Sequence, residues 1–288
     1  MQLLDGKRIL VTGSTRGLGR GFVEALAAAG AAVVVNGTGA ELVDEVVDGI
    51  RERGGTAVGA VGSVADDDVA AGLVQACVDE HGGIDAVVNN AGIVRDRTLM
   101  NMTPEEFDEV VAVNLRGTWS ISRHAAQAMK ATGGLLLQII SGSAMVGSVG
   151  QTNYAASKAG VLGMMYAWDV ELKRYAIRVN ALWPIAQTDM TEVVFAGAAR
   201  RAEEAGRPVP EPADLGFGTP QTVAPVVVHL CSDRAAHLRS QIVTFNGRKL
   251  GLWTHPHETV LDRRPAWTVD ELADALDRAD EQVHVPQM

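Results

Sequence analysis

The chain has 288 residues, of which 47% are hydrophobic, and it carries a formal net charge of −10 at pH 7. This length and apolar content suit one α/β domain with a single large core. The acidic balance provides no basic surface for a nucleic acid and no basic block for a membrane, so we expect small molecules and further copies of the chain as partners.

The first strand pattern and the cysteines indicate in which cellular compartment we expect the protein. That pattern starts at Arg8, which leaves no room for a signal peptide, and no apolar run approaches the ~20 residues that cross a bilayer. Cys77 and Cys231 lack metal-ligand spacing, and His255 and His257 flank a single proline in a tail, a pattern typical of solvated side chains. We expect a cytoplasmic protein with reduced thiols and no metal site.

Short runs rich in Val, Ile and Leu alternate with longer segments of helical period. The predicted helices cover residues 18–29, 42–50, 105–131 and 153–175. The alternation predicts a single-domain, Rossmann-type, doubly wound parallel sheet of about seven strands with helices on both faces. The predicted strands are Arg8–Thr12, Ala32–Asn36, Thr56–Gly62, Asp85–Asn89, Leu135–Ile140, Ile177–Trp183 and Gln241–Phe245.

Two regions depart from this alternation. Residues 192–219 begin with a helical pattern and become rich in Pro and Gly from Gly206, which predicts a mobile lid. Beyond the domain that we assign to residues 1–253, a C-terminal extension covers residues 254–288. Within it Thr268-Val-Asp-Glu271 is a capping-box pattern that predicts a terminal helix.

The first strand runs into Thr12-Gly13-Ser14-Thr15-Arg16-Gly17-Leu18-Gly19 and then into a helix. Glycines permit tight turning and a close approach to the backbone, and a helix N-terminus offers free N–H groups and positive dipole to a pyrophosphate. Three glycines in such a turn also occur as plain turn chemistry. Placement after the first strand favours the dinucleotide interpretation.

Tyr154-Ala-Ala-Ser-Lys158 places a phenol and an ammonium four residues apart, on one face of a predicted helix. A free tyrosine, with a pKa near ~10, is a poor base at neutral pH, and a neighbouring cation favours its ionised form. An ordinary aromatic-to-lysine contact on a surface helix would give the same spacing. The catalytic interpretation of Tyr154 and Lys158 is favoured by the other motifs that occur with them.

Taken together, these motifs resemble the short-chain dehydrogenase/reductase family over roughly residues 4–250. The matching elements follow the family's order and spacing: the glycine loop, Asn89-Asn90-Ala91-Gly92 after the fourth strand, Asn114 in a helix, Ser141 after the fifth strand, and Tyr154 with Lys158. Residues 92–118 resemble the branch of 3-oxoacyl-carrier-protein reductases and the hydroxyacyl-CoA dehydrogenase domains of multifunctional enzymes.

The resemblance implies a proton relay of four catalytic residues. Tyr154 would exchange a proton with the substrate oxygen, and Ser141 would hydrogen-bond the same oxygen. Lys158 would lower the pKa of the tyrosine and bind the nicotinamide ribose, and Asn114 would hold a water that links Lys158 to solvent. Ser143 is a rival for Ser141, although the family's spacing selects Ser141, and an Asn in a helix can also simply face water.

The resemblance also implies the cofactor contacts. Two positions depart from the family pattern: Ile185 stands where glycine is usual, and Ser63 stands where an aspartate commonly touches adenine. The implied cofactor-binding residues, besides Tyr154 and Lys158, are Gly13, Ser14, Thr15, Arg16, Gly17, Leu18, Gly19, Asn36, Gly37, Thr38, Ser63, Val64, Asn90, Ala91, Gly92, Pro184, Ile185 and Thr188.

The end of the second strand favours NADP over NAD. Gly37 stands where NAD-selective relatives commonly carry an aspartate that repels a 2′-phosphate, and Arg16 matches a position where basic residues contact that phosphate. No Arg or Lys follows Gly37 directly, and Arg16 could be a solvated loop charge. NAD is therefore the alternative cofactor.

The expected reaction interconverts a secondary alcohol and a ketone on a 3-hydroxyacyl or 3-oxoacyl thioester, or on a related steroid or polyketide carbonyl. The alternative is a catalytically silent nucleotide-binding regulator with the same fold. The family also implies a homotetramer. The row of small residues Ala155, Ala159, Gly163 and Ala167 permits close helix approach between copies, unless this ridge packs on the chain's own sheet.

Overall fold

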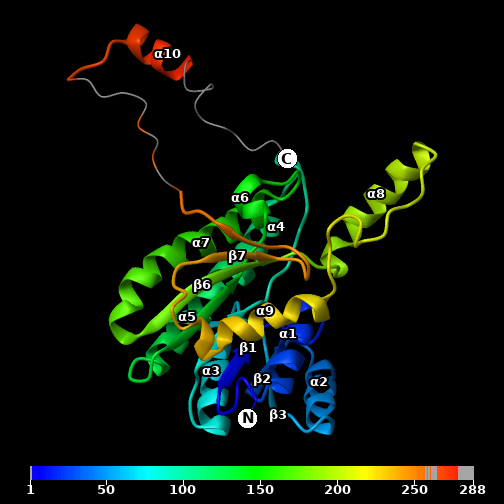
Figure 1. The fold of residues 1–288 in the computed structure, drawn as a ribbon, viewed down its shortest axis with the longest axis vertical. Coiled ribbons are helices and arrows are strands. Elements are labelled where there is room, and N and C mark those ends of the chain that lie inside the picture. Colours follow the sequence, from blue (N-terminus) through cyan, green and yellow to red (C-terminus); the bar gives the residue numbers. More distant parts are fainter. Residues whose placement is uncertain (1, 257, 259, 261–264, 278–288) are drawn as a thin grey trace. The chain divides into compact units, whose positions relative to one another are not determined.

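The computed structural model describes residues 2–256, 258, 260 and 265–277. The chain divides into two compact units, Met1–Trp253 and Thr254–Met288, which are described separately here. The first unit is an α/β domain with one sheet between two layers of helices, and it confirms the predicted fold class (Figure 1).

The sheet has eight strands in the order β3-β2-β1-β4-β5-β6-β7-β8. Neighbouring strands are parallel except for β7 and β8, and the order reverses its direction of growth between β1 and β4. In such a sheet, ligands bind outside the carboxyl ends of the strands near that reversal. The strands are β1 Arg8–Val11, β2 Ala32–Gly37, β3 Thr56–Val61, β4 Ala86–Asn89, β5 Gly134–Ile139, β6 Ile177–Pro184, β7 Ile242–Phe245 and β8 Leu250–Trp253.

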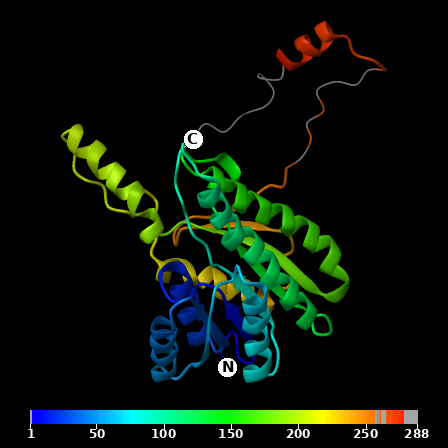
Figure 2. The same ribbon diagram turned by 180° about the vertical axis from the view of Figure 1, so that it is seen from behind.

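Helices cover both faces of the sheet (Figures 1 and 2). Helices α1, α2 and α9 bury their apolar sides on one face, and α3, α5 and α7 on the other. The α-helices of this unit are α1 Gly17–Ala28, α2 Ala40–Glu52, α3 Asp67–His81, α4 Pro104–Val111, α5 Thr118–Ala128, α6 Ser143–Val146, α7 Thr152–Leu172, α8 Glu192–Glu204 and α9 Pro220–Cys231.

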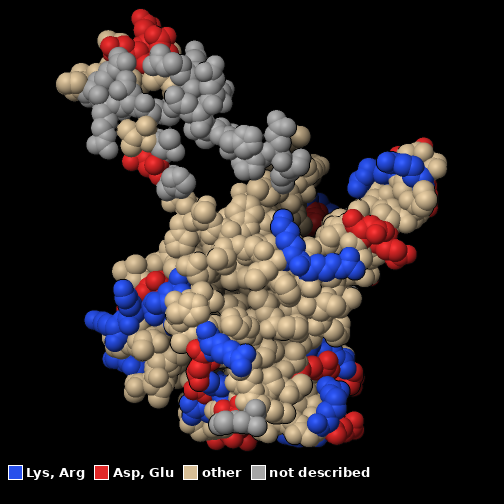
Figure 3. Space-filling model, viewed as in Figure 1, with Lys and Arg blue, Asp and Glu red and all other residues tan. Residues whose placement is uncertain are grey.

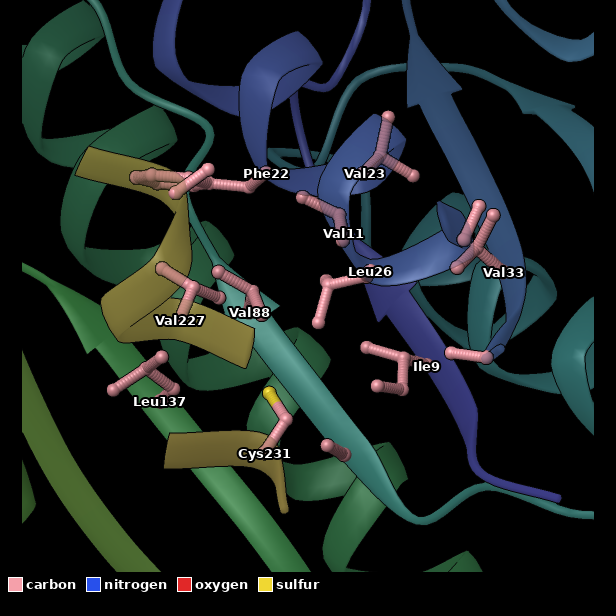
Figure 4. Packing of buried hydrophobic residues seen from close by; sticks show 14 of the residues in the cluster. Ile9, Val11, Phe22, Val23, Leu26, Val33, Val88, Leu137, Val227 and Cys231 are labelled. Atoms are coloured by element: carbon pink, nitrogen blue, oxygen red, sulfur yellow. The ribbon is translucent and has the colours of Figure 1, made fainter. Parts of the chain in front are cut away.

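The core on the α1 side consists almost entirely of branched aliphatic side chains. Strands buried on both faces select Val, Ile and Leu because these side chains fit the pleated surface and bury apolar area without polar atoms. Figure 4 shows the layer in which strand residues meet helix residues across the sheet surface, among them Ile9, Val11, Leu26, Val88, Leu137 and Val227.

Strand β8 lies beyond the seven predicted strands. It pairs antiparallel with β7 through a hairpin in which Gly247 has a φ of +88°. The strand is short, and its Leu250 and Leu252 are exposed, so it lacks the buried apolar run that marks the other strands. A sequence pattern based on burial therefore does not predict β8.

The long helical pattern at 105–131 is three helical pieces in the structure. Helix α4 begins with a capping box between Thr103 and Glu106, and the π-helical segment η1, Ala112–Gly117, separates it from α5. A π-helical turn contains an extra residue, which changes the direction in which side chains leave the helix, and such turns occur frequently at functional sites. Asn114 lies in this segment.

The described part of the second unit contains helix α10, Val269–Asp277. Its first turn is capped by Thr268 and Glu271, with the Thr268 N–H donating to Glu271 Oε2 at 2.8 Å and the Glu271 N–H to Thr268 Oγ1 at 3.3 Å. His257 lies outside the described residues. Among the described helices, none has the length and apolar character needed to cross a bilayer.

Charged side chains on the face shown in Figure 3 mix both signs. Lys and Arg lie among Asp and Glu over the lower part of the domain. Charged side chains of the domain also form ion pairs, such as that between Arg20 Nη1 and Glu45 Oε1 at 2.8 Å on α1 and α2. Exposed pairs of this kind contribute little to stability.

Candidate active site

The glycine loop joins β1 to α1 at the carboxyl edge of the sheet. Gly13 has a φ of +60° and Gly17 of +53°, a left-handed conformation that favours glycine. A Cβ on Gly13 would lie 2.9 Å from Ala91 Cα, and one on Gly19 would collide with the Gly13 carbonyl oxygen and Asn90 Nδ2. The loop therefore packs tightly on the Asn90-Ala91 segment, which leaves no room for side chains at these positions.

Thr12 and Asn90 tie the loop to the segment after β4. Thr12 Oγ1 accepts hydrogen bonds from the N–H groups of Asn90 and Ala91, both at 3.0 Å. In return, Asn90 Nδ2 donates to the carbonyl oxygens of Thr12 at 3.0 Å and Gly13 at 2.9 Å. This exchange fixes the shape of the loop and supports the placement of Asn90 and Ala91 in the cofactor region.

Asn36 is buried, and its side chain is used within the protein. Its Oδ1 accepts from the Gly13 N–H at 3.1 Å, and its Nδ2 donates to the carbonyl oxygens of Ala60 and Gly62, both at 3.1 Å. Its carbonyl oxygen accepts from the Ser14 N–H at 2.7 Å. Asn36 thus joins the glycine loop to β3, and it would support the loop of the cofactor site through these hydrogen bonds.

The N-terminus of α1 has the features that a pyrophosphate requires. No side chain caps the first turn of this helix, so its N–H groups are open to an anion. Arg16 and Thr38 are exposed beside it, whereas Leu18 packs into the core. A Cβ on Gly17 would lie 3.7 Å from Thr188 Cγ2, so Thr188 faces the loop. These residues fit a bound dinucleotide.

Ser63 and Val64 follow β3, and Ser63 borders a shallow hollow. Val64 is buried against Gly117, while Ser63 Oγ accepts from the Ala65 N–H at 3.3 Å. The hollow is lined by Ser63, Ala65, Asp66, Asp67, Asp68 and Arg116. Ser63 and Val64 lie at the end of β3, and their contact with the adenine side of a cofactor stays a prediction.

Lys158 is the most buried charged group of the site, with 3% of its surface exposed. Its Nζ donates to the Ile139 carbonyl oxygen at 2.8 Å and lies 5.8 Å from the centre of the Tyr154 ring. Burial lowers the pKa of Lys158 to about 8, because the ammonium is removed from water. A Cβ on Gly92 would lie 3.7 Å from this Nζ, so the Gly92 segment meets Lys158.

Tyr154 and Ser141 face one another, as the family pattern implies. Burial raises the pKa of Tyr154, a hydrogen bond with Ser141 opposes that change, and the charge of Asp96 raises the pKa further. Burial is the largest of these effects. The phenol is therefore kept in its protonated form, which suits a proton donor to a carbonyl oxygen.

The geometry distinguishes Ser141 from its rival Ser143. Ser143 is buried, and its hydroxyl donates to Gln151 Oε1 at 2.7 Å and lies 3.1 Å from Ser148 Oγ. Its N–H donates to Ser141 Oγ at 3.3 Å. The Ser141 hydroxyl also donates to Ser143 Oγ at 3.4 Å, and what separates the two serines is that Ser141 is the one that contacts Tyr154.

Asn114 is fully buried and does not face water. Its Oδ1 accepts from the Ile93 N–H at 2.8 Å, and its Nδ2 donates to the Ile93 carbonyl oxygen at 3.0 Å and to Ser157 Oγ at 3.3 Å. Ser157 precedes Lys158 on α7. The π-helical turn therefore ties the Gly92 segment to the helix that carries Tyr154 and Lys158.

The segment after β6 has little free backbone. The Ile185 N–H donates to the Phe245 carbonyl oxygen at 2.9 Å, and the Ile185 carbonyl oxygen accepts from the Gly218 N–H at 3.1 Å. These bonds leave only the Ile185 side chain, with that of Pro184, to touch a nicotinamide. The Thr188 N–H donates to Thr191 Oγ1 at 2.8 Å, and the Thr188 hydroxyl makes no hydrogen bond with other described residues.

Two contributors to the site have no motif in the sequence. Gln151 Nε2 donates to Asp96 Oδ2 at 3.1 Å, which places the Asp96 carboxylate near Tyr154. The π-helical turn at Asn114 is the other. Neither has a local signal, because the two partners lie far apart along the chain and π-helical turns have no composition of their own.

Together, the glycine-rich turn and the Ser141, Tyr154 and Lys158 set define an α/β enzyme that binds a dinucleotide and moves a proton. A family profile described as short chain dehydrogenase matches residues 7–199. The chain is 38% identical over 292 residues to the hydroxyacyl-CoA dehydrogenase ChsB1 of Mycobacterium tuberculosis, covering 95% of this chain and 88% of that relative.

Two further relatives agree. The chain is 36% identical over 248 residues to the 3-oxoacyl-acyl-carrier-protein reductase FabG of Aquifex aeolicus, covering 85% of this chain and 97% of that one. The crystal structure of a short chain dehydrogenase from Mycobacterium avium matches with a TM-score of 0.84 and 36% identity, covering 99% of this chain and 98% of that one. The protein belongs to the short-chain dehydrogenase/reductase family, and it is an NAD(P)-dependent oxidoreductase acting on CH–OH groups.

Proposed function

We propose that the protein interconverts 3-hydroxyacyl and 3-oxoacyl thioesters, or a related steroid or polyketide alcohol and ketone, with NADP(H). The observation that carries the proposal is the contact set of Ser141, Tyr154 and the buried Lys158. The names of a hydroxyacyl-CoA dehydrogenase and a 3-oxoacyl reductase among the relatives support the thioester class.

In the reductive direction, Tyr154 donates its phenolic proton to the substrate carbonyl oxygen while Ser141 hydrogen-bonds that oxygen. A bound nicotinamide supplies the hydride, or accepts it in the oxidative direction. Lys158 places a positive charge beside the phenol, which stabilises the phenolate that remains after transfer. Asn114 holds the Gly92 segment and α7 in register, and it would also hold the water that links Lys158 to solvent.

Arg16, Thr15 and Gly37 support NADP(H) as the cofactor, with NAD(H) as the alternative. Arg16 is exposed, and its guanidinium makes no hydrogen bond or ion pair with other described residues, so it is available to a 2′-phosphate. Gly37 adds no negative charge to the end of β2. A Cβ at Gly37 would lie 2.5 Å from Thr15 Cγ2, so Thr15 occupies the space that an acidic side chain would need.

We infer that residues 192–219 form a lid over the substrate. The two ends of this excursion meet at its base, where the Gln187 N–H donates to the Gly218 carbonyl oxygen at 2.8 Å. Inside it, Phe195 of α8 packs edge-on against Phe217 with ring centres 5.0 Å apart. Asn246 Nδ2 also donates to the Gly216 carbonyl oxygen at 2.8 Å, near the same end. A segment held near its ends can swing as a unit, and its length would accommodate a bulky acyl or polycyclic group.

We also infer a homotetramer. On the small-residue ridge of α7, Ala159, Gly163 and Ala167 are exposed, and nothing lies within 4 Å of a Cβ placed on Gly163. The ridge therefore does not pack on the chain's own sheet, which leaves a second copy as its partner.

Cofactor consumption with a panel of substrates tests the proposal. Purified full-length protein is mixed with NADPH or NADH and with acetoacetyl-CoA, a cyclic ketone, a steroid ketone or a simple aliphatic ketone. The proposal expects the highest kcat/KM with NADPH and a 3-oxoacyl thioester, steroid or polycyclic ketone. Tight cofactor binding without turnover of any carbonyl would favour the silent regulator instead.

A further inference from the structure

The turn that follows β5 carries Ser141 and Gly142. The backbone conformation at Gly142 does not require a glycine. Gly142 has a φ of −56° and a ψ of −28°, a right-handed conformation that every L-residue adopts. The three heavy atoms nearest to a Cβ placed on Gly142 all belong to one side chain, that of Trp183. A Cβ on Gly142 would overlap Cζ2 of Trp183 and would lie 2.7 Å from Cη2 and 2.9 Å from Cε2 of the same indole.

The indole of Trp183 therefore lies against the backbone of the serine turn. Trp183 is the next-to-last residue of β6, and the following residues Pro184 and Ile185 form the expected nicotinamide segment. Trp183 thus contacts the turn that carries Ser141 with its side chain and directly precedes, along the chain, the segment that would touch the nicotinamide. It packs on the sheet face that α7 covers, the helix of Tyr154.

A second tryptophan supports the first from the edge strand. The rings of Trp183 and Trp253 have centres 5.5 Å apart and an interplanar angle of 37°. Trp253 Nε1 donates to Thr244 Oγ1 at 2.8 Å, and Thr244 is the β7 neighbour of Trp183 in the sheet. The hydrogen bond fixes the orientation of the Trp253 ring, which in turn limits the movement of the Trp183 ring.

From these contacts we propose that Trp183 is a positioning residue for Ser141, and that β8 supports the catalytic serine through the Trp253–Trp183 pair. The inference rests on the proposed role of Ser141. The Ser141 hydroxyl reaches Tyr154 only while the Ser141-Gly142-Ser143 turn keeps its place, and the indole is the side chain packed on that turn at Gly142. Misplacing a reacting group by about 1 Å can lower a rate by about 100-fold.

The first test compares Trp183→Ala, Ser141→Ala and the double variant in NADPH-dependent reduction of the best substrate of the panel. We expect Trp183→Ala to lower kcat by about 10- to 100-fold while NADPH affinity stays within about twofold. In the Ser141→Ala background the same change should lower kcat by no more than about twofold, because a residue that acts through Ser141 has nothing left to position. Leu252→Ala, an exposed change on β8, is the matched control and should leave kcat unchanged.

A second pair of variants tests the contact itself. Gly142→Ala should lower kcat by about tenfold or more in the wild-type chain, because the methyl group collides with the indole. In the Trp183→Ala chain, the same change should cost almost nothing. Trp183→Phe keeps an aromatic ring on the turn, should fold normally, and should have an activity between those of wild type and Trp183→Ala. If Trp183→Ala does not fold, Trp183→Phe tests the positioning role of Trp183 in its place.

The pH profile supplies a readout that a general loss of packing would not move. The hydrogen bond from Ser141 lowers the pKa of Tyr154. Displacing Ser141 raises that pKa, so the acid limb of alcohol oxidation should shift to higher pH in Trp183→Ala and in Ser141→Ala alike. Equal kcat in wild type and Trp183→Ala would overturn the inference, as would full additivity with Ser141→Ala. Wild-type turnover in Ser141→Ala alone would instead contradict the proposed function.

Discussion

Gly37 at the end of β2 offers a direct test of cofactor choice. An aspartate at this position would place a carboxylate where a 2′-phosphate is expected, and its Cβ would lie 2.5 Å from Thr15 Cγ2 and 3.1 Å from Thr15 Oγ1. Ordinary carbon–carbon contacts are about 3.5 to 4.0 Å, so Thr15 has to move by about 1 Å or change rotamer. Gly37→Asp therefore has a steric and an electrostatic effect.

The two effects have separate magnitudes. Overpacking of this kind costs about 1 to 3 kcal/mol of folding free energy. Two unit charges about 6 Å apart interact by about 3 kcal/mol at an effective dielectric constant of ~20, which corresponds to roughly a 100-fold loss of NADPH affinity. Thr15→Ala removes both clashing γ atoms and leaves a Cβ about 3.4 Å away, so the double variant should recover the lost stability.

The assay measures kcat/KM with NADPH and NADH, together with urea unfolding, for both single variants and the double variant. We expect Gly37→Asp alone to lose stability and NADPH activity, and Thr15→Ala/Gly37→Asp to regain stability and to prefer NADH. Thr15→Ala alone should keep the wild-type preference. The reasoning is refuted if Gly37→Asp is as stable as wild type, or if it keeps its preference for NADPH.

Three further predictions concern the buried lysine, the ridge and the lid. Because the folded-state pKa of Lys158, about 8, lies below its ordinary value of 10.5, the folded chain binds fewer protons than the unfolded chain between these values. Stability should therefore rise by about 2 kcal/mol from pH 7.5 to 9.5 relative to Lys158→Met, measured by urea unfolding, and equal pH slopes would contradict it. Gly163→Arg on the exposed ridge should reduce the tetramer to smaller species in light scattering, and an unchanged mass would count against the ridge interface. Amide exchange across residues 192–219 should slow when cofactor and substrate are both bound, and equal rates in both states would exclude a closing lid.

Sequence patterns predict most of the fold because burial produces them. Seven strands were predicted, each to within about two residues; six of them lie inside the sheet and carry apolar runs, and β3 forms one edge. Strand β8 is held by hydrogen bonds at an edge and exposes Leu250 and Leu252, so hydrophobic pattern carries no information about it. The π-helical turn at Asn114 is set by contacts with Ile93 and Ser157, which are distant in sequence.

The candidate site shows the same division. Tyr154 and Lys158 are joined by helical spacing, and the glycine loop by its place after β1, so local sequence predicts both. Asn36 was predicted as a cofactor contact from its place at the end of the second strand. In the structure its side chain makes three hydrogen bonds that join the glycine loop to β3 and the residue after it. The match between Gly142 and Trp183 joins the turn after β5 to strand β6, and only the folded chain brings these residues into contact.

Replacing Tyr154 with phenylalanine tests the central claim most directly, because this change removes the transferable proton and leaves the ring in place. NADPH affinity and turnover of the best substrate are measured for the wild-type chain and for Tyr154→Phe. The account predicts that turnover falls by at least about 100-fold while cofactor affinity stays within about threefold. Near-normal turnover in Tyr154→Phe would contradict the assignment of Tyr154 as the proton donor.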